Sequence, residues 1–245
     1  MILTKLVKLN NFKSIHSLIL PISAIAATIL FYLGSRSALV TSPIDYQQFD
    51  AVRIMYVHVP AAWMALMIYS MMAISNLSGF VWKNPFSYLI AKSIAPIGAM
   101  FTAITLITGS IWGKPIWGTW WVWDARLTSV LILFFLYIGY IILVNSFDDI
   151  SKGEKIAAII SVVGFINIPI IKFSVEFWNS LHQPASILRS KGIAIAPEML
   201  KPLLLMFAAF VCYFITFALI RIQNQINIKK VERLCTDRSR PVTTN

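Results

Sequence analysis

Six long apolar stretches limit what this chain can fold into. Each approaches the roughly 20 residues that a helix needs to cross the hydrocarbon core of a bilayer, and none alternates with the period of two expected for a barrel strand. Only 13% of the 245 residues are charged and 58% are apolar, whereas soluble domains are about a quarter charged. We therefore predict an all-α integral membrane protein with six transmembrane helices. They are expected near Ser17 to Leu33, Ala61 to Trp82, Tyr88 to Ile111, Leu127 to Ser146, Lys155 to Phe173 and Pro202 to Ile222.

The lysines and arginines predict how the helices are oriented, because these residues are enriched on the cytoplasmic side of membrane proteins. The terminal segments and even-numbered loops hold Lys5, Lys8, Lys13, Lys83, Lys92, Lys152, Lys155, Arg221, Lys229, Lys230, Arg233, Arg238 and Arg240. The odd-numbered loops, which are longer, hold only Arg36, Arg53, Lys114, Arg126, Lys172, Arg189, Lys191 and Lys201. We predict that both termini are cytoplasmic.

This orientation divides the chain into a six-helix membrane domain, residues 1–222, and a cytoplasmic tail, residues 223–245. Three outer loops are then expected at residues 35–60, 112–126 and 174–201. The net charge of +11 is explained by membrane topology and contact with anionic lipid, so nucleic acid is not expected as a partner. The sequence has no Gly-rich phosphate loop, so any ATP hydrolysis would belong to a partner protein.

Two of the three histidines, His58 and His182, fall in the predicted outer loops. Each is followed by a residue and then Pro-Ala. Because proline is favoured in the first turn of a helix, each histidine is expected just ahead of a helix start, where the positive dipole end disfavours the imidazolium. A neutral imidazole is the form that binds metal. The alternative is that each is a polar residue at the membrane interface, which is our interpretation of His16 at the inner start of the first helix.

Five of the eight tryptophans lie within residues 112–124, at Trp112, Trp117, Trp120, Trp121 and Trp123. If this segment is helical, with Lys114-Pro115 as its start, then Trp117, Trp120, Trp121 and Asp124 share one face. Such a face suits a flat, apolar ring system. The alternative is an aromatic belt that anchors helix ends at the interface, but a belt needs only one or two tryptophans for each helix end. The concentration favours a platform.

Arg126 and Arg53 lie in the same outer loops. Arginine pairs bidentately with carboxylates, so both are candidates to hold the acid groups of a ring whose metal lies between the histidines. The alternative is contact with lipid headgroups, or a local pair with Asp124 or Asp50.

The run Trp117-Gly118-Thr119-Trp120-Trp121-Val122-Trp123-Asp124-Ala125-Arg126-Leu127-Thr128-Ser129 resembles the tryptophan-rich WWD motif of haem-handling proteins in cytochrome c maturation. The chain length, the six helices and the two flanking histidines further resemble the haem exporter protein C (CcmC) family. The resemblance covers nearly the whole chain.

The resemblance implies a haem-binding and transfer protein with no catalytic residues, rather than an enzyme. It implies that haem b is bound transiently at the periplasmic face of a bacterial inner membrane, or less readily of a mitochondrial one. His58 and His182 would be the axial ligands, Trp117, Trp120, Trp121, Trp123 and Asp124 the platform and docking surface, and Arg126 and Arg53 the propionate partners. The implied partners are the haem chaperone CcmE, which takes the haem, the ATPase complex of CcmA and CcmB, and the small single-span protein CcmD.

Two other classes remain open at this point. A membrane redox protein of the cytochrome b type would place histidine pairs at membrane depth, whereas the predicted helices contain only the end residue His16. A permease subunit of another ABC transporter would use the tryptophans as interfacial anchors alone, and it would bind no haem.

Overall fold

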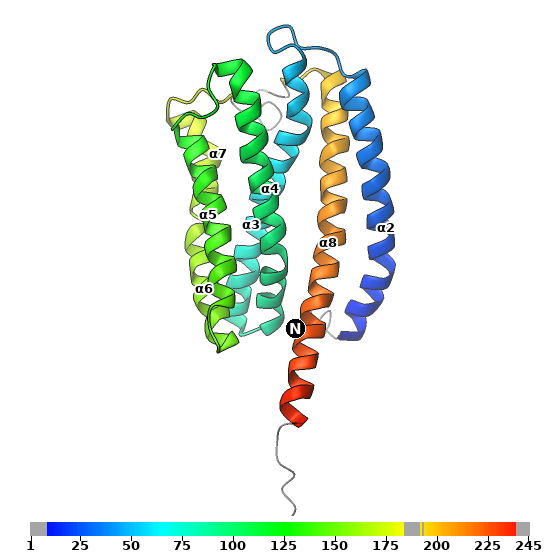
Figure 1. The fold of residues 1–245 in the computed structure, drawn as a ribbon, viewed down its shortest axis with the longest axis vertical. Helices are drawn as coiled ribbons and strands as arrows, with labels where there is room; N and C mark the ends of the chain where they lie inside the picture. The colour runs from blue at the N-terminus through cyan, green and yellow to red at the C-terminus, as the bar shows by residue number, and fades with distance from the viewer. Residues whose placement is uncertain (1–8, 184–191, 193, 239–245) are drawn as a thin grey trace, which may run out of the picture.

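The computed structural model describes residues 9–183, 192 and 194–238, and within them it contains helices and no β-strand. Six of its helical segments are long and apolar enough to cross a membrane, which confirms the predicted all-α, six-span architecture. Figure 1 shows α2 (Leu9–Arg36), α3 (Met55–Trp82), α4 (Pro85–Trp117), α5 (Ala125–Asn145), α6 (Ile150–Gly164), α7 (Asn167–Phe177) and α8 (Pro197–Arg238).

The last helix extends well beyond the predicted span. The sixth apolar stretch ends near Ile222, yet α8 runs from Pro197 to Arg238 and projects from the bundle (Figure 1). At about 1.5 Å per residue, a helix of 42 residues is roughly twice as long as a bilayer core requires. The beginning of the predicted polar tail is therefore helical. Residues 239–245 lie outside the described residues.

Three helix starts use a side chain to cap free backbone N–H groups. Asn84 accepts from the Phe86 N–H at 3.1 Å ahead of α4, and Asp149 accepts from the Ser151 N–H at 2.9 Å ahead of α6. Asp124 accepts from the Leu127 N–H at 2.7 Å ahead of α5. Asparagine and aspartate are favoured caps because their short side chains reach these N–H groups. Asp124 thus has a defined local role in starting α5.

The fifth span is broken into α6 and α7. Pro169 in the first turn of α7 carries no N–H, and its ring would clash with the carbonyl of Phe165, four residues earlier, if one helix continued. Asn167 donates from Nδ2 to the Ser129 carbonyl at 2.8 Å and so holds α7 on α5. The segment that leads to His182 therefore begins at the end of α7, at Phe177.

In the bundle α3 and α4 lie at the centre, with α5, α6 and α7 on one side and α8 and α2 on the other (Figure 1). Small residues and hydrogen bonds join the helices, as is common in membranes. Gly98 lets the Tyr137 ring approach α4, and the Tyr137 hydroxyl donates to the Ala65 carbonyl at 2.8 Å. Asn76 donates to the Ser161 hydroxyl at 2.7 Å. These contacts fix α5 and α6 against the central pair.

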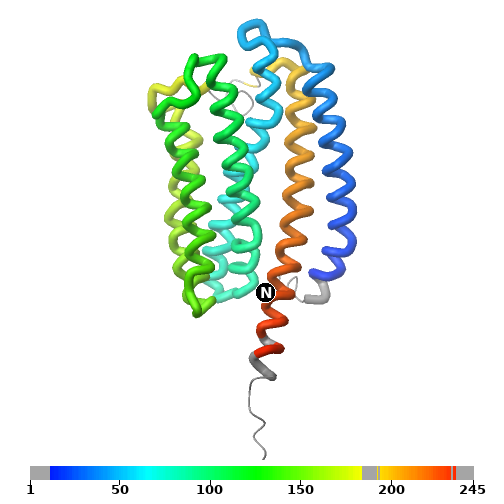
Figure 2. Tube along the Cα trace, viewed as in Figure 1, coloured from blue at the N-terminus to red at the C-terminus, as the bar shows by residue number. Residues whose placement is uncertain are grey.

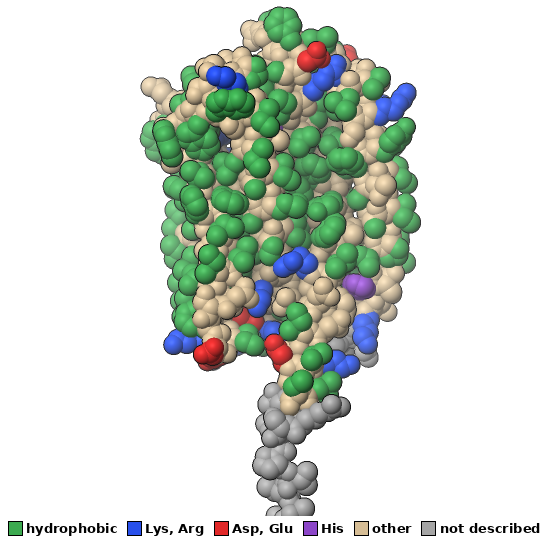
Figure 3. Space-filling view, in the orientation of Figure 1, with side chains coloured by type: hydrophobic (Ala, Val, Ile, Leu, Met, Phe, Trp, Pro, Cys, Tyr) green, Lys and Arg blue, Asp and Glu red, His purple; other side chains and the backbone are tan. Residues whose placement is uncertain are grey.

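Three connections gather at one end of the bundle, which we call the loop end: residues 37–54, residues 118–124, and the described residues that adjoin α7 and α8, 178–183 and 194–196 (Figure 2). The short turns at residues 83–84 and 146–149 lie at the opposite end. Figure 3 shows apolar side chains covering the middle of one face, while charged side chains lie mainly toward the two ends. The predicted outer loops therefore share one end of the molecule.

Candidate functional site

The structure brings His58 and His182 together at the loop end. Their ring centroids are 6.3 Å apart and their planes are inclined by 36°. His58 belongs to the first turn of α3, which begins at Met55, so the expectation that this histidine precedes the helix is wrong. The reason is that a short 3-10 helix at Asp50–Ile54 leads directly into α3. The predicted helix start at Pro184, after His182, lies outside the described residues.

The His58 ring is buried, and α4 fixes its orientation. Nδ1 lies 3.1 Å from the Thr108 hydroxyl, which itself donates to the Ile104 carbonyl at 2.6 Å. Because a hydroxyl has one proton to give, Thr108 accepts from His58, and Nδ1 carries the imidazole hydrogen. Nε2 then keeps the lone pair that binds metal. A Cβ on Gly109 would lie 2.9 Å from the His58 Cε1, so the ring needs glycine there.

Trp112 forms a wall beside His58. The two rings meet edge to face with centroids 5.6 Å apart, and the indole N–H donates to the Gln48 Oε1 at 2.9 Å. Neither Trp112 nor Thr108 was predicted at the site from the sequence. Thr108 and Trp112 are four residues apart, so they lie on one face of α4. This spacing could have shown from the sequence that the two side chains are neighbours.

His182 lies in the connection after α7 and is half-buried. Its Nδ1 is 2.9 Å from the Gln183 carbonyl, which can only accept, so Nδ1 is again the donor and Nε2 keeps its lone pair. Burial lowers the pKa of His182 below its ordinary value, which favours the neutral imidazole. Both histidines thus offer the same nitrogen in its metal-binding form.

The spacing of this pair suits one iron between two imidazoles. A metal bond to an imidazole nitrogen is about 2 Å long. Two such bonds, together with the distance from each nitrogen to the centre of its ring, place the two ring centroids about 6 Å apart. The observed 6.3 Å agrees. A planar tetrapyrrole supplies the other four ligands of an iron, so a pair of histidines suits haem.

The tryptophan run does not form the predicted helix. α4 ends at Trp117, because Gly118 adopts a left-handed conformation with φ of 73° and returns its N–H to the Lys114 carbonyl. The predicted single face through Trp117, Trp120, Trp121 and Asp124 is therefore wrong. Lys114 and Pro115, expected at the start of a helix, lie in the last turn of α4.

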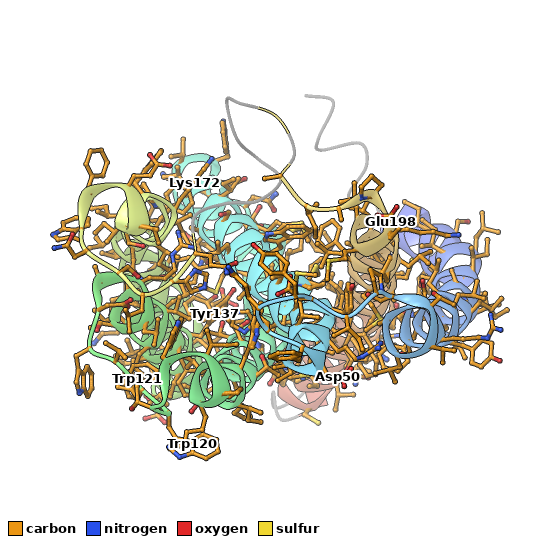
Figure 4. All side chains as sticks on the ribbon, turned by 90° about the horizontal axis from the view of Figure 1, so that it is seen from above. Asp50, Trp120, Trp121, Tyr137, Lys172 and Glu198 are labelled. Atoms are coloured by element: carbon orange, nitrogen blue, oxygen red, sulfur yellow. The ribbon has the colours of Figure 1, made fainter. Side chains whose placement is uncertain are left out.

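The side chains of the run point to different surroundings instead. Trp120 and Trp123 are 56% and 75% exposed, and Figure 4 shows Trp120 at the edge of the loop end. Trp121 is half-buried, and its indole N–H is buried with no hydrogen-bond partner among the described residues. A buried N–H without an acceptor is costly, so a ligand carbonyl or carboxylate that reached Trp121 would gain a hydrogen bond from it.

Asp124 and Arg126 connect the start of α5 to the segment that carries His182. The Asp124 carboxylate accepts from the Leu127 N–H and from the Ser180 hydroxyl. Arg126 donates from Nε to the Ser174 hydroxyl and from Nη2 to the Lys172 carbonyl, both at 3.1 Å. The salt bridge between Asp124 and Arg126, which the sequence left as an alternative, is not found among the described residues.

Arg53 makes the local pair that the sequence left as an alternative. Its Nε lies 2.9 Å from the Asp50 carboxylate, and Nη1 donates to the carbonyls of Ala38 and Leu39 at 2.7 Å each. Arg53 therefore ties the first loop together. A guanidinium has five N–H donors, so Arg53 and Arg126 both have donors beyond these contacts.

Comparison with known proteins gives one consistent result. Residues 2–237 match the family model described as "Heme exporter protein C". "Heme exporter protein C" of Bradyrhizobium diazoefficiens is 46% identical over 96% of this chain and 89% of its own length, and that of Escherichia coli K12 is 44% identical over 87% and 86%. A "putative cytochrome c biosynthesis ccmC-like mitochondrial protein" of Marchantia polymorpha is 54% identical over 71% of this chain and 73% of its own.

The match spans all six membrane helices and both histidines of the site, at an identity far above what a shared fold alone would require. The chain therefore belongs to the haem exporter protein C family of multi-pass membrane proteins.

Proposed function

We propose that this protein binds haem b at the loop end for cytochrome c biogenesis, with His58 and His182 as the axial ligands of the iron. The observation that carries this proposal is the histidine pair, whose ring centroids lie 6.3 Å apart. Both Nδ1 atoms are engaged as donors, which leaves both Nε2 atoms for iron. Haem is the cargo here, and the side chains bind and orient it without catalysing a reaction.

We further propose that the loop end faces the periplasm across the bacterial inner membrane and that both termini are cytoplasmic. The excess of lysine and arginine in the terminal segments and short turns supports this orientation. Haem delivered to an extracytoplasmic cytochrome is needed on that side.

The tryptophan-rich segment would serve two purposes in this proposal. Trp112 packs against His58 and so lines the haem site, and we assign the half-buried Trp121 to the haem platform. Trp120 and Trp123 are exposed and suit the docking of a protein partner, while Trp117 supports the turn through its contact with Gly113. Arg126 and Arg53, with donors to spare, would hold the propionates.

The partner that fits this surface is the haem chaperone CcmE, which receives the haem. The ATPase complex of CcmA and CcmB, together with the single-span CcmD, would supply energy from ATP hydrolysis. The role of this chain in such a complex is to present haem in a defined orientation.

The proposal is tested by the absorption spectrum of the protein, purified with its partner proteins from haem-replete cells. We expect a low-spin, six-coordinate haem. His16→Ala serves as the control, because His16 lies toward the opposite end of the bundle in α2, where its ring lies beside that of Phe12; this variant should keep the spectrum. Protein that contains no haem under these conditions would contradict the proposal and favour a permease of another kind.

The docking role predicts a separate effect of the exposed indoles. Replacing Trp120 and Trp123 together by alanine should reduce haem transfer to the chaperone about tenfold, because exposed aromatic residues commonly dominate protein interfaces. The haem bound to this chain should stay unchanged. Transfer is measured as covalent haem on the chaperone. Trp82→Ala is the matched control, since Trp82 is 72% exposed at the opposite end; an equal loss in this control would show that membrane anchoring, not docking, was affected.

A further inference from the structure

Ser180 lies between the end of α7 at Phe177 and His182, in a segment without regular secondary structure. A side chain in such a segment samples many positions unless contacts hold its backbone, and ordering it costs about 1 to 2 kcal/mol per residue. A histidine that binds iron must nevertheless be held in one place. The contacts of Ser180 show how this is done.

The Ser180 hydroxyl has two partners. It donates its proton to the Asp124 carboxylate and accepts the backbone N–H of His182 at 3.1 Å. The second contact is the local turn that serine side chains make with the residue two positions on. Ser180 therefore joins the main chain of His182 to the carboxylate of Asp124.

Asp124 is itself held on both carboxylate oxygens. It is buried, 9% exposed, and its other carboxylate oxygen caps α5 by accepting the Leu127 N–H at 2.7 Å. The positive end of a helix dipole favours a carboxylate at this position, and a hydrogen bond to a charged acceptor is stronger than one between neutral groups. The hydroxyl of Ser180 is thus fixed to the start of α5.

Arg126, two residues after Asp124 and in the first turn of α5, provides a second attachment. It binds the Ser174 hydroxyl and the Lys172 carbonyl in the last turns of α7. The segment that leads to His182 is consequently held at two points by residues that flank the start of α5. His58 is held differently, through Thr108 on α4.

We infer that Ser180 is a positioning residue for the second iron ligand: its hydroxyl, held by Asp124, fixes the backbone of His182. The inference rests on the proposed haem site and assigns to Asp124 the part of an anchor for this ligand.

The test compares Ser180→Ala with Ser180→Thr in the full-length, haem-loaded protein. The alanine variant lacks the hydroxyl and should lose His182 from the iron, giving a five-coordinate, high-spin spectrum and about tenfold weaker haem retention, the size of effect seen when a partner of a metal ligand is removed. Free imidazole should restore the six-coordinate spectrum. The threonine variant keeps the hydroxyl and should resemble the unmodified protein.

Ser146→Ala is the matched control, because the Ser146 hydroxyl donates to the Ile142 carbonyl within its own helix end, at the opposite end of α5. A six-coordinate spectrum in Ser180→Ala, combined with loss of a ligand in His182→Ala, would overturn the inference and leave the haem site standing. Equal losses in the alanine and threonine variants, without rescue by imidazole, would also overturn it, as a merely structural effect. If His182→Ala and His58→Ala both keep a six-coordinate haem, the proposed site itself is wrong.

Discussion

His58→Ala is expected to convert the bound haem from six-coordinate and low-spin to five-coordinate and high-spin. It should also reduce the haem retained by the purified protein by a factor of about 10 or more. His58 is the more rigid of the two proposed ligands: it is 8% exposed, lies on a helix, and its ring is enclosed by Thr108, Gly109 and Trp112. Alanine has no nitrogen to bind the iron, and His182 already occupies the other axial position in the proposed site. The absorption spectrum and the haem-to-protein ratio measure the two effects.

A second substitution tests the same ligand without removing it. Gly109→Ala would place a methyl group 2.9 Å from the His58 Cε1, so the ring must move from its position beside Thr108. We expect a partial loss of the six-coordinate spectrum. Free imidazole should repair His58→Ala, since the gap is open, but it should repair Gly109→Ala less well because the displaced ring occupies the space. An unaltered spectrum in His58→Ala would exclude this histidine as a ligand.

The largest expected effect on stability comes from Gly98→Ala. A Cβ at this position would lie 2.3 Å from the ring of Tyr137, which is fully buried and bonded through its hydroxyl to the Ala65 carbonyl. The ring cannot turn away without breaking that bond, so α4 and α5 must separate. Overpacking of this kind costs about 1 to 3 kcal/mol, occasionally more. Thermal unfolding in detergent should therefore begin at a clearly lower temperature.

Gly139→Ala on α5 is the matched control, because nothing lies within 4 Å of the Cβ that it would gain. It should change the unfolding temperature little, or raise it slightly, since alanine is the better helix former by up to about 1 kcal/mol. Tyr137→Ala combined with Gly98→Ala should be less destabilised than the sum of the two single variants. Strictly additive losses would mean that Gly98 and Tyr137 do not meet in the membrane-embedded protein.

The number and order of the membrane helices could be predicted because each depends on a local property. A run of apolar residues is helical in a bilayer wherever it occurs, since its backbone has no other way to satisfy its hydrogen bonds. The break in the fifth span was less accessible. A proline such as Pro169 can kink a helix, but whether the helix bends or breaks depends on contacts such as that of Asn167 with the Ser129 carbonyl on α5.

The histidines of the candidate site were predicted, while their surroundings were not. His58 and His182 stood out as imidazoles in two predicted outer loops, and the structure places their rings beside one another. The tryptophan run was misread as a helix, because the left-handed turn at Gly118 was not recognised as its end. Trp112, which packs on His58, belongs to the same cluster of tryptophans but was not assigned to the site.

The sequence by itself determined that this protein has six membrane-spanning helices, three connections at a common end, and a family-specific set of histidines and tryptophans. Hydropathy, charge and motif are carried by neighbouring residues, so they can be recognised without a fold. Only the tertiary structure decided that Thr108 sets the tautomer of His58, that Arg53 pairs with Asp50, and that Ser180 joins Asp124 to His182. The bond between His58 and Thr108 and the bond between Ser180 and Asp124 each link residues 50 or more positions apart, and which helix faces which is fixed by packing rather than by local sequence.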